Sequence, residues 1–136
     1  DVKRAEEDFV RHYGGAHQFA IDTLEQGFGF TDEALLNLQT IAKMRDEAWW
    51  TEAHDRRMLR LTPEIHTRWA KAHELCDTIR NDCINVHDAK TLRTARGKYN
   101  GLARLAKEAE QECDAMLELV HEVREFTHEG LEEARS

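Results

Sequence analysis

Two Glu-x-x-His patterns are the most metal-like feature of this 136-residue sequence: Glu118 with His121, and Glu125 with His128. In helical bundles this spacing holds di-iron centres when the copies project into one core from different helices. Here both copies fall on one predicted helix, and its apolar positions place them on the outward face. We therefore expect no metal site and no cofactor.

The three cysteines, Cys76, Cys83 and Cys113, form no Cys-x-x-Cys pair, which excludes the common zinc and redox motifs. All three fall at apolar helix positions, so we expect them to be buried as small core residues. A Cys83–Cys113 bridge in an oxidising compartment is the alternative. The odd cysteine count slightly favours a cytoplasmic protein over a processed secreted chain. The first residue, Asp1, indicates a processed product or a fragment.

Several histidines lie beside the predicted core rather than in a ligand set. His66, His73 and His87 follow one predicted helix at multiples of seven residues. We expect half-exposed side chains that border a groove between helices. A pH-responsive edge is the alternative, because histidine titrates near ~6.5. His17 falls on the apolar stripe of the first helix, where a hydrogen-bonded core histidine is expected.

No arrangement typical of nucleophilic catalysis or phosphate binding is present. The only serine is Ser136, and there is no Gly-x-Ser-x-Gly, Walker-type or dinucleotide-binding loop. We therefore expect no catalytic residues and no enzymatic activity. An enzyme assembled from scattered acidic and histidine side chains is the least favoured alternative. The net charge of −8 argues against general binding of nucleic acid.

Trp49 and Trp50 are adjacent, and adjacent helical residues point about 100° apart, so they cannot share one apolar stripe. Trp49 continues the stripe of its predicted helix, and Arg45 precedes it by four residues, a spacing that permits stacking. Trp50 then lies at the edge of the stripe or outside it. Because an exposed tryptophan is a common interface anchor, Trp50 is a candidate partner-binding residue. Burial between two neighbouring helices is the alternative.

Charge is segregated in the last third of the chain. Residues Ala89–Lys107 contain six lysines and arginines and no acidic residue, whereas Glu108–Ser136 carries ten acidic and two basic residues. In an antiparallel bundle the basic turn lies at the same end as the Gly27–Phe30 turn. We therefore expect a partner-binding tip, with a solvated turn as the alternative. The tip comprises Phe28, Phe30, Arg96, Lys98 and Tyr99.

Three segments with glycine or proline divide the chain: Gly27–Phe30, Thr62–Pro63 and Arg96–Gly101. Between them no apolar/polar alternation is sustained, so nothing indicates a strand. Short connections favour antiparallel neighbours, so we expect an all-α fold with roughly 70% helix or more, an up-down-up-down four-helix bundle with long helices. The helices are predicted near residues 2–26, 31–60, 63–96 and 100–134.

Two of these breaks have an alternative. Thr62 is a good N-cap residue and Pro63 suits the first turn of a helix, which favours a new start there over one kinked helix through Pro63. The apolar seam of the last predicted helix begins at Ala95, before the glycines of the third break, so a kink is the alternative to a turn.

Two heptad seams, typical of coiled-coil packing, support the last two predicted helices. The first comprises Ile65, Trp69, Ala72, Cys76, Ile79, Cys83 and Val86. The second comprises Ala95, Tyr99, Leu102, Ala106, Ala109, Cys113, Met116, Val120 and Val123.

The chain is expected to form one domain, residues 1–136, because its length leaves no room for a second. Its longest run without Asp, Glu, Lys or Arg, His12–Ile21, has 10 residues and is too short to span a bilayer. We predict a soluble, acidic, non-enzymatic helical module that binds another protein, as a monomer or a homo-oligomer. The alternative is a carrier that holds an apolar or haem-like ligand between helices.

Overall fold

Three long helices make up the computed structural model of the chain: α1 (Val2–Ala42), α2 (Glu52–His87) and α3 (Leu92–Arg135), with 41, 36 and 44 residues. The structure describes residues 2–87 and 92–136, without the side chains of residues 2, 3, 5, 6, 9, 10, 83–87, 92–95 and 98. Within these residues there is no strand, so the all-α class and the expected helix content are confirmed. None of the described helices combines the length and apolarity needed to cross a membrane.

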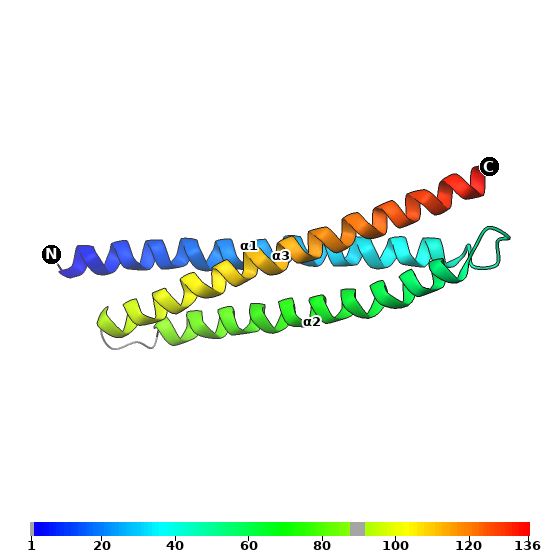
Figure 1. Cartoon of the computed structure of the whole chain (residues 1–136). Helices are drawn as coiled ribbons and strands as arrows, with labels where there is room; N and C mark the ends of the chain where they lie inside the picture. Colours follow the sequence, from blue (N-terminus) through cyan, green and yellow to red (C-terminus); the bar gives the residue numbers. More distant parts are fainter. Residues whose placement is uncertain (1, 88–91) are drawn as a thin grey trace.

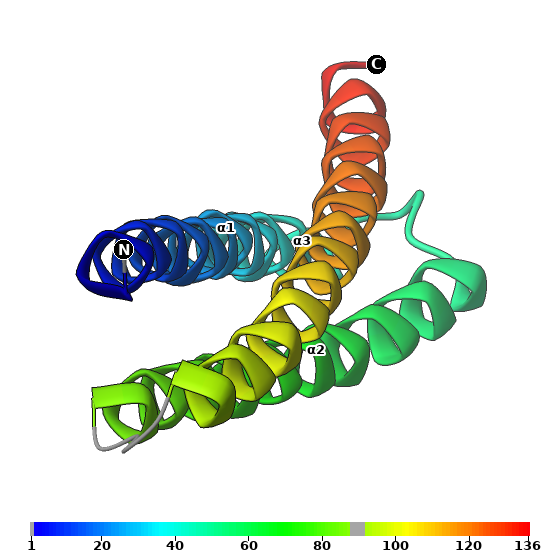
Figure 2. The ribbon, with the colours of Figure 1, turned by 90° about the vertical axis from the view of Figure 1, so that its left-hand side faces the viewer.

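The helices α1 and α3 run in the same direction, and α2 runs antiparallel to both (Figure 1). Seen from the end of the bundle, α3 crosses the other two helices obliquely (Figure 2). The interface between α1 and α3 is the most extensive of the three. The bundle is therefore built around this parallel pair, with α2 packed along one side.

The expected four-helix bundle is wrong, because none of the three predicted breaks interrupts a helix. Gly27–Phe30 lies within α1, Pro63 within α2 and Gly97–Gly101 within α3. The chain reverses instead in residues 43–51, which are not α-helical, and between α2 and α3, where residues 88–91 lie outside the described part. The continuous helices considered as alternatives at Pro63 and near Ala95 are therefore the correct ones.

Gly27 permits close packing rather than a turn. A Cβ atom at this position would overlap the end of the Met116 side chain and would lie 3.5 Å from the Cα atom of Cys113. Gly130 is placed in the same way against the side chain of Ile41. Gly27 lets the backbones of α1 and α3 approach, and Gly130 leaves room for the Ile41 side chain. This packing acts against the ~1 kcal/mol that a glycine costs inside a helix.

The helix α2 starts well before Pro63 because Thr51 caps it. The N–H of Thr51 donates to Nδ1 of His54 at 3.0 Å, which is one half of a capping box, and the carbonyl oxygen of Thr51 accepts the first helical N–H, that of His54, at 3.1 Å. Pro63 is exposed, and the neighbouring Thr62 hydroxyl donates to the carbonyl oxygen of Met58 at 3.0 Å. Thr62 thus bonds within the helix instead of starting one.

Two clusters of buried side chains fill the bundle along its length. The first comprises Tyr13, Ala20, Ile21, Leu24, Ala72, Cys76, Ile79, Leu102, Ala109 and Met116. The second comprises Ala34, Leu38, Ile41, Met58, Leu61, Ile65, Leu119, Val120, Val123 and Phe126. Half-buried Phe30 packs against both clusters and joins them into one continuous core.

The cysteines Cys76 and Cys113 are buried, as predicted. Both are free thiols, so the alternative of a Cys83–Cys113 bridge is wrong. The side chain of Cys83 lies outside the described residues, and its predicted burial stays a prediction. The thiols of Cys76 and Cys113 serve as small core groups between helices.

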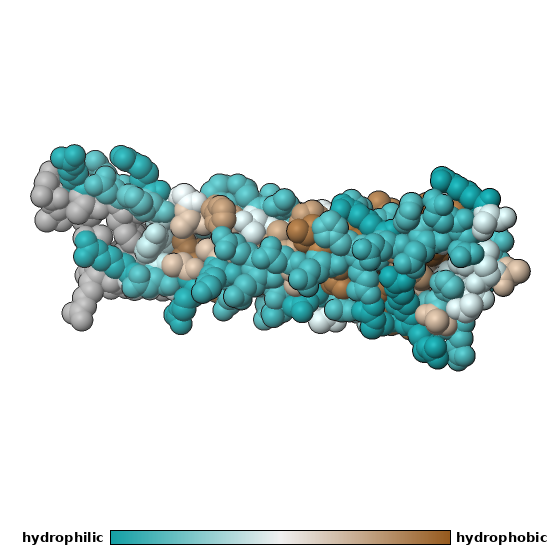
Figure 3. Space-filling view, turned by 45° about the horizontal axis from the view of Figure 1, so that its top comes forward, coloured by the Kyte–Doolittle hydropathy of each residue, from teal (hydrophilic) through white to brown (hydrophobic). Residues whose placement is uncertain are grey.

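The face of the molecule drawn in Figure 3 is largely hydrophilic, with apolar side chains showing near its middle. Among the exposed residues, the guanidinium of Arg124 in α3 donates to both carboxylate oxygens of Glu33 in α1, at 2.7 Å from Nη2 to Oε1. These hydrogen bonds lower the pKa of Glu33. The pair marks the parallel register of α1 and α3, although exposed pairs of this kind contribute little stability.

Candidate functional site

Ion pairs join α2 to α3 along one side of the bundle, and we call them the ion-pair ladder. In each, the cation comes from α2 and the carboxylate from α3, so a basic stretch of α2 faces the acidic half of α3. This charge arrangement favours the antiparallel pairing of the two helices. The pairs are Arg57–Glu129 at 3.0 Å, Arg60–Glu122, Arg68–Glu112 at 3.4 Å and Lys71–Glu112 at 2.8 Å.

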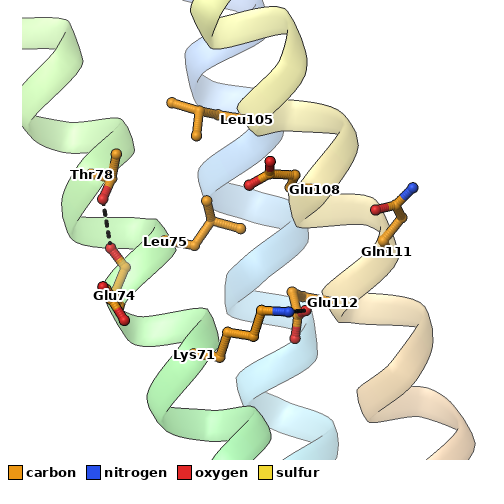
Figure 4. Close-up of a pocket in the computed structure, with 8 residues that line it drawn as sticks. All are labelled: Lys71, Glu74, Leu75, Thr78, Leu105, Glu108, Gln111 and Glu112. Atoms are coloured by element: carbon orange, nitrogen blue, oxygen red, sulfur yellow. Dashed lines mark hydrogen bonds and ion pairs between the residues drawn. The ribbon is translucent and has the colours of Figure 1, made fainter.

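Where the ladder ends, α2 and α3 border a groove of about 490 Å³, which we call the acidic groove (Figure 4). Its apolar part is formed by Leu75 of α2 and Leu105 of α3, which are half-buried. Charged and polar side chains form the rest. The lining residues are Lys71, Glu74, Leu75, Thr78, Leu105, Glu108, Gln111 and Glu112.

Glu112 is the buried charge of this groove, with only 7% of its side chain exposed. Its Oε1 lies 2.8 Å from Nζ of Lys71 and 3.4 Å from Nη1 of Arg68. Its Oε2 is also buried, and within the described residues it has no hydrogen-bond partner. A buried acceptor without a partner costs about 1–3 kcal/mol, and more when it is charged.

About one turn along from Lys71 and Glu112, the groove is also lined by Glu74 of α2 and Glu108 of α3. Both side chains are carboxylates, both are exposed, and neither has an ion-pair partner in the described part of the chain. The ion-pair ladder therefore does not extend to these two residues. The acidic groove contains three carboxylates and a single lysine.

The sequence-based prediction missed Glu112, although a signal for it exists. Leu105, Glu112, Leu119 and Phe126 follow one another at seven-residue spacing, so they share one stripe of α3. Glu112 is the only charged member of that stripe. Burying a charge is costly, so a glutamate in an otherwise apolar stripe is unusual. That pattern is the signal in the sequence that could have identified Glu112.

On the other side of α2, facing α1, three rings form what we call the aromatic flank: Phe28, Trp69 and His73. The rings of Trp69 and His73 stack with centroids 5.2 Å apart, and the ring of Phe28 lies 6.3 Å from that of Trp69. Trp69 is 42% exposed, so its predicted place in the buried seam is wrong. Trp69 lies against Phe28 at the edge of α1 and not in the core.

A second groove, of about 320 Å³, lies between α1 and α2. His66 lines it and precedes Trp69 by three residues and His73 by seven, which places all three on one side of α2. His66 and His73 are exposed beside the core, close to the expectation for them. The groove is lined by Leu35, Leu38, Gln39, Ala42, Arg45, Met58, Thr62 and His66.

The predicted tip of basic and aromatic residues is not assembled, because α1 continues through the expected turn. Phe28 contacts α2 in the middle of the bundle, and Phe30 lies between the two core clusters. The ring of Tyr99 lies 6.4 Å from that of Tyr13. Tyr13 and Phe28 are separated by about 22 Å along α1, given the rise of a helix.

The basic members of the predicted tip lie near the start of α3. Arg96 is exposed, and the side chain of Lys98 lies outside the described residues. Arg96 lies at the end of the bundle where α3 begins, whereas Phe28 contacts α2 in its middle. A partner-binding role for Arg96 and Lys98 stays a prediction.

Trp50 is held by contacts within the chain. Its Nε1 donates to Oδ1 of Asp55 at 2.7 Å, and its ring stacks on His54 with centroids 5.0 Å apart. The ring also lies 6.1 Å from Phe126 of α3, and Trp50 is half-buried. These contacts close the end of the core beside residues 43–51, and they give Trp50 a structural role. Its predicted role as an interface anchor is untested.

Other predicted ligand residues are placed as follows. The Glu-x-x-His residues of α3 are exposed, in agreement with the outward face expected for them. His17 is half-buried and its Nε2 has no partner among the described residues, so the hydrogen bond expected for it is not found. The side chain of His87 lies outside the described residues. In residues 2–87 and 92–136, no group of three or more His, Cys, Asp or Glu side chains is arranged to hold a metal ion.

Comparison with known proteins gives no family for this fold. No protein-family model matches the chain, and neither the curated proteins nor the solved structures contain a significant match.

Proposed function

We propose that the chain is a non-enzymatic helical module that binds another protein through the aromatic flank. The observation that carries this proposal is Trp69, a tryptophan that is 42% exposed and yet packed against the rings of Phe28 and His73. Tryptophan is enriched among the residues that dominate interface energies. A side chain already held in place loses less conformational entropy on binding.

The surroundings of Trp69 suit a helix of a partner. Leu59, which is 71% exposed, precedes His66 by seven residues and so extends the same side of α2 towards its N-terminus. The groove between α1 and α2 lies beside this line of residues and offers the apolar side chains of Leu35 and Ala42. An amphipathic helix lying along α2 would place its apolar residues on Trp69 and in this groove.

The carrier alternative has weaker support. An apolar or haem-like ligand needs a long apolar groove, whereas the acidic groove is lined mainly by charged and polar side chains. The groove between α1 and α2 is smaller, at about 320 Å³, and includes Arg45, Gln39 and His66. The acidic groove therefore does not resemble the apolar pocket that such a ligand requires, and the groove between α1 and α2, although its lining is more apolar, is small.

The proposal is tested by selecting helical peptides from a displayed library on the wild-type chain and measuring their affinity for variants. We expect Trp69→Ala to weaken the selected peptides by about tenfold or more, the size typical of an interface hot spot. Sedimentation equilibrium of the free chain shows in the same samples whether a second copy already covers this side.

Phe19→Ala is the matched control, because Phe19 is a 52% exposed aromatic residue on α1. It lies nine residues from Phe28, which places it about 180° around the helix and away from the aromatic flank. Selected peptides should bind this variant like the wild type. Peptides that bind Trp69→Ala as tightly as the wild type would contradict the proposed surface.

A further inference from the structure

We propose that a second copy of this chain is the partner on the exposed side of α2, with its own α2 packed antiparallel to the first. The inference rests on the proposed function, because it names the partner of the surface that contains Trp69. Nine residues of α2 that follow one another at alternating steps of four and three carry it, and we call them the outer stripe. They are Glu52, Arg56, Leu59, Pro63, His66, Ala70, His73, Asp77 and Arg80.

The outer stripe is a second heptad seam, on the side of α2 that faces away from the core. All nine of its side chains are exposed, whereas Leu61, Ile65 and Ala72 are fully buried on the opposite side of the helix. In both ribbon views no helix of the described part of the chain covers the outer side of α2 (Figures 1 and 2). Steps of four and three keep one side of a helix turned towards a partner helix over several turns. A second helix therefore finds a continuous line of positions there.

The middle of the outer stripe is uncharged. Between Arg56 and Asp77, about 30 Å along the helix, the stripe contains no Asp, Glu, Lys or Arg, in a chain in which 34% of the residues are charged. Leu59 is 71% exposed within it, and Trp69, 42% exposed, lies beside it. Depletion of charge together with an exposed tryptophan is typical of the central part of a protein interface.

The charges at the two ends of the outer stripe favour a second copy over an unrelated helix. Their order along the helix is Glu52, Arg56, Asp77, Arg80, so the signs run negative, positive, negative, positive. An antiparallel pair with its two-fold axis at His66 sets Arg56 against Asp77 of the second copy, and Glu52 against Arg80. A parallel pair would set like charges against each other, which is destabilising. Such self-complementarity is what an interface with two-fold symmetry requires.

The same symmetry gives the exposed apolar side chains a contact. Trp69 and Pro63 are each three residues from His66, so Trp69 of one copy lies level with Pro63 of the other. Leu59 and His73 are each seven residues from His66 and are level in the same way. The exposed rings of Trp69 and His73, which already stack on each other, would thus be covered by apolar groups of the second copy.

The charges of the outer stripe have no other structural explanation within α2. The helix dipole favours Glu52 in the first turn, but its effect ends within about one turn and does not account for Arg56 or Asp77. Arg56 forms no ion pair within the described residues. Oδ2 of Asp77 lies 3.4 Å from Nδ1 of His73, in a pair that is exposed to water and therefore weak.

The outward face of α3 lacks this pattern. Its exposed residues Asp114, Glu118 and Glu125 are all acidic, so two copies of that face would repel each other. Self-complementarity is therefore not a general property of the exposed helix faces of this chain.

The test measures self-association of the full chain by sedimentation equilibrium, from micromolar to millimolar concentration. We expect a dimer of the wild type. Arg56→Asp and Asp77→Arg should each weaken it by about tenfold or more, because symmetry sets like charges together at both ends of the interface. An equimolar mixture of the two variants should associate like the wild type, because opposite charges then meet again at both ends.

The matched controls are Arg104→Asp and Glu110→Arg, which make the same changes of charge at exposed positions of α3. Each should dimerise within about twofold of the wild type, since exposed charges outside an interface contribute little. Trp69→Ala, by contrast, should weaken the dimer as well as the selected peptides.

A spin label at Ala53→Cys, in a Cys83→Ala background, reports the orientation of the pair, because Cys76 and Cys113 are buried and Ala53 is exposed. Antiparallel helices centred on His66 place the two labels about 40 Å apart. Parallel helices would place them about 10 Å apart, the distance between packed helices. Double electron–electron resonance measures the separation.

Four results would overturn the inference. They are a wild type that stays monomeric at every concentration, equal weakening by the stripe variants and the controls, a mixture of Arg56→Asp and Asp77→Arg that does not associate, and labels close together. A monomeric wild type whose selected peptides still depend on Trp69 would overturn the second copy alone and leave the proposed function standing. Peptide binding that is unchanged in Trp69→Ala would contradict the proposed function itself, whatever the state of association.

Discussion

Gly27 of α1 lies directly against the side chain of Met116 of α3, and the missing Cβ atom is what gives Met116 its place. Met116 is fully buried there, in the core cluster that also contains Leu24. Two residues further along the same helix, Gly29 has open space around the position of a Cβ atom. Each glycine is followed by a phenylalanine, but only Gly27 is packed against the neighbouring helix.

This contrast predicts opposite effects of one substitution. Gly27→Leu should destabilise the fold by about 1–3 kcal/mol, because the added side chain overfills the α1–α3 interface. Gly29→Leu should stabilise it by about 0.5–1 kcal/mol through helix propensity, since nothing obstructs the new side chain. Urea unfolding followed by circular dichroism measures both. A stabilising Gly27→Leu would mean that α1 and α3 do not meet at this point.

Pro63 offers a test of the continuous helix α2. Proline inside a helix removes a hydrogen bond and crowds the preceding turn, at a cost of about 3 kcal/mol relative to alanine. Pro63→Ala should therefore raise the free energy of unfolding by about 1–3 kcal/mol. If a helix began at this residue, the same change would be neutral or destabilising, because proline is favoured in a first turn. Guanidinium unfolding distinguishes the two outcomes.

The contacts of Trp50 predict that its main contribution is to stability. Trp50→Ala removes the hydrogen bond to Asp55 and the ring contacts with His54 and Phe126, and should cost about 2–3 kcal/mol. Trp69→Ala should cost less than about 1 kcal/mol, because its ring is more exposed. Thermal unfolding of the two variants gives the comparison. Equally small losses of stability in the two variants would contradict the structural role of Trp50 and favour its role as a surface anchor.

The buried cysteines predict slow and pH-dependent chemistry. Burial raises the pKa of the Cys76 and Cys113 thiols above the ordinary value, so little reactive thiolate is present near neutral pH. In a Cys83→Ala background, both thiols should react with a disulfide reagent far more slowly in the native than in the unfolded protein. Rapid labelling of native protein would contradict their burial.

The same pKa shifts predict a loss of stability in alkali. A thiol whose pKa is higher in the folded state stabilises the fold below the unfolded pKa, and this contribution is lost as the pH rises through the folded pKa. Stability should therefore fall between about pH 8 and pH 10 more steeply in wild type than in Cys76→Ala with Cys113→Ala. Urea unfolding at several pH values measures the slopes, and parallel slopes would contradict the shifts.

A charged residue at Cys76 is the stronger test of the core. Cys76→Asp should destabilise the fold by several kcal/mol, because the site is 3% exposed and the carboxylate would lose its hydration there. Asp77→Asn, which changes an exposed neighbour, should have an effect within about 0.5 kcal/mol. Comparable stability of Cys76→Asp and wild type would show that position 76 faces water.

The sequence by itself determined the helical class and most of the core positions. Leu102, Met116, Val120 and Val123 are fully buried, as the heptad seam of α3 predicts, because a seam repeats with the period of the helix and needs no knowledge of its neighbours. The outward face of the Glu-x-x-His patterns follows from the same seam. Local periodicity is therefore enough to say which side of each helix is apolar.

Only the tertiary structure decided where the helices end and which residues meet. The low helix propensity of glycine predicts a helix break at Gly27. The contact with Met116 that offsets this propensity comes from a residue about 90 positions away, so no local pattern reveals it. The capping of α2 by Thr51 similarly outweighs the attractive start at Thr62. Because α1 continues through Gly27, Phe28 and Phe30 lie in the middle of the bundle and not at its end, where the tip was expected. The burial of Glu112 against Lys71 depends on the register between α2 and α3, and that register is set by packing between helices, which no local pattern specifies.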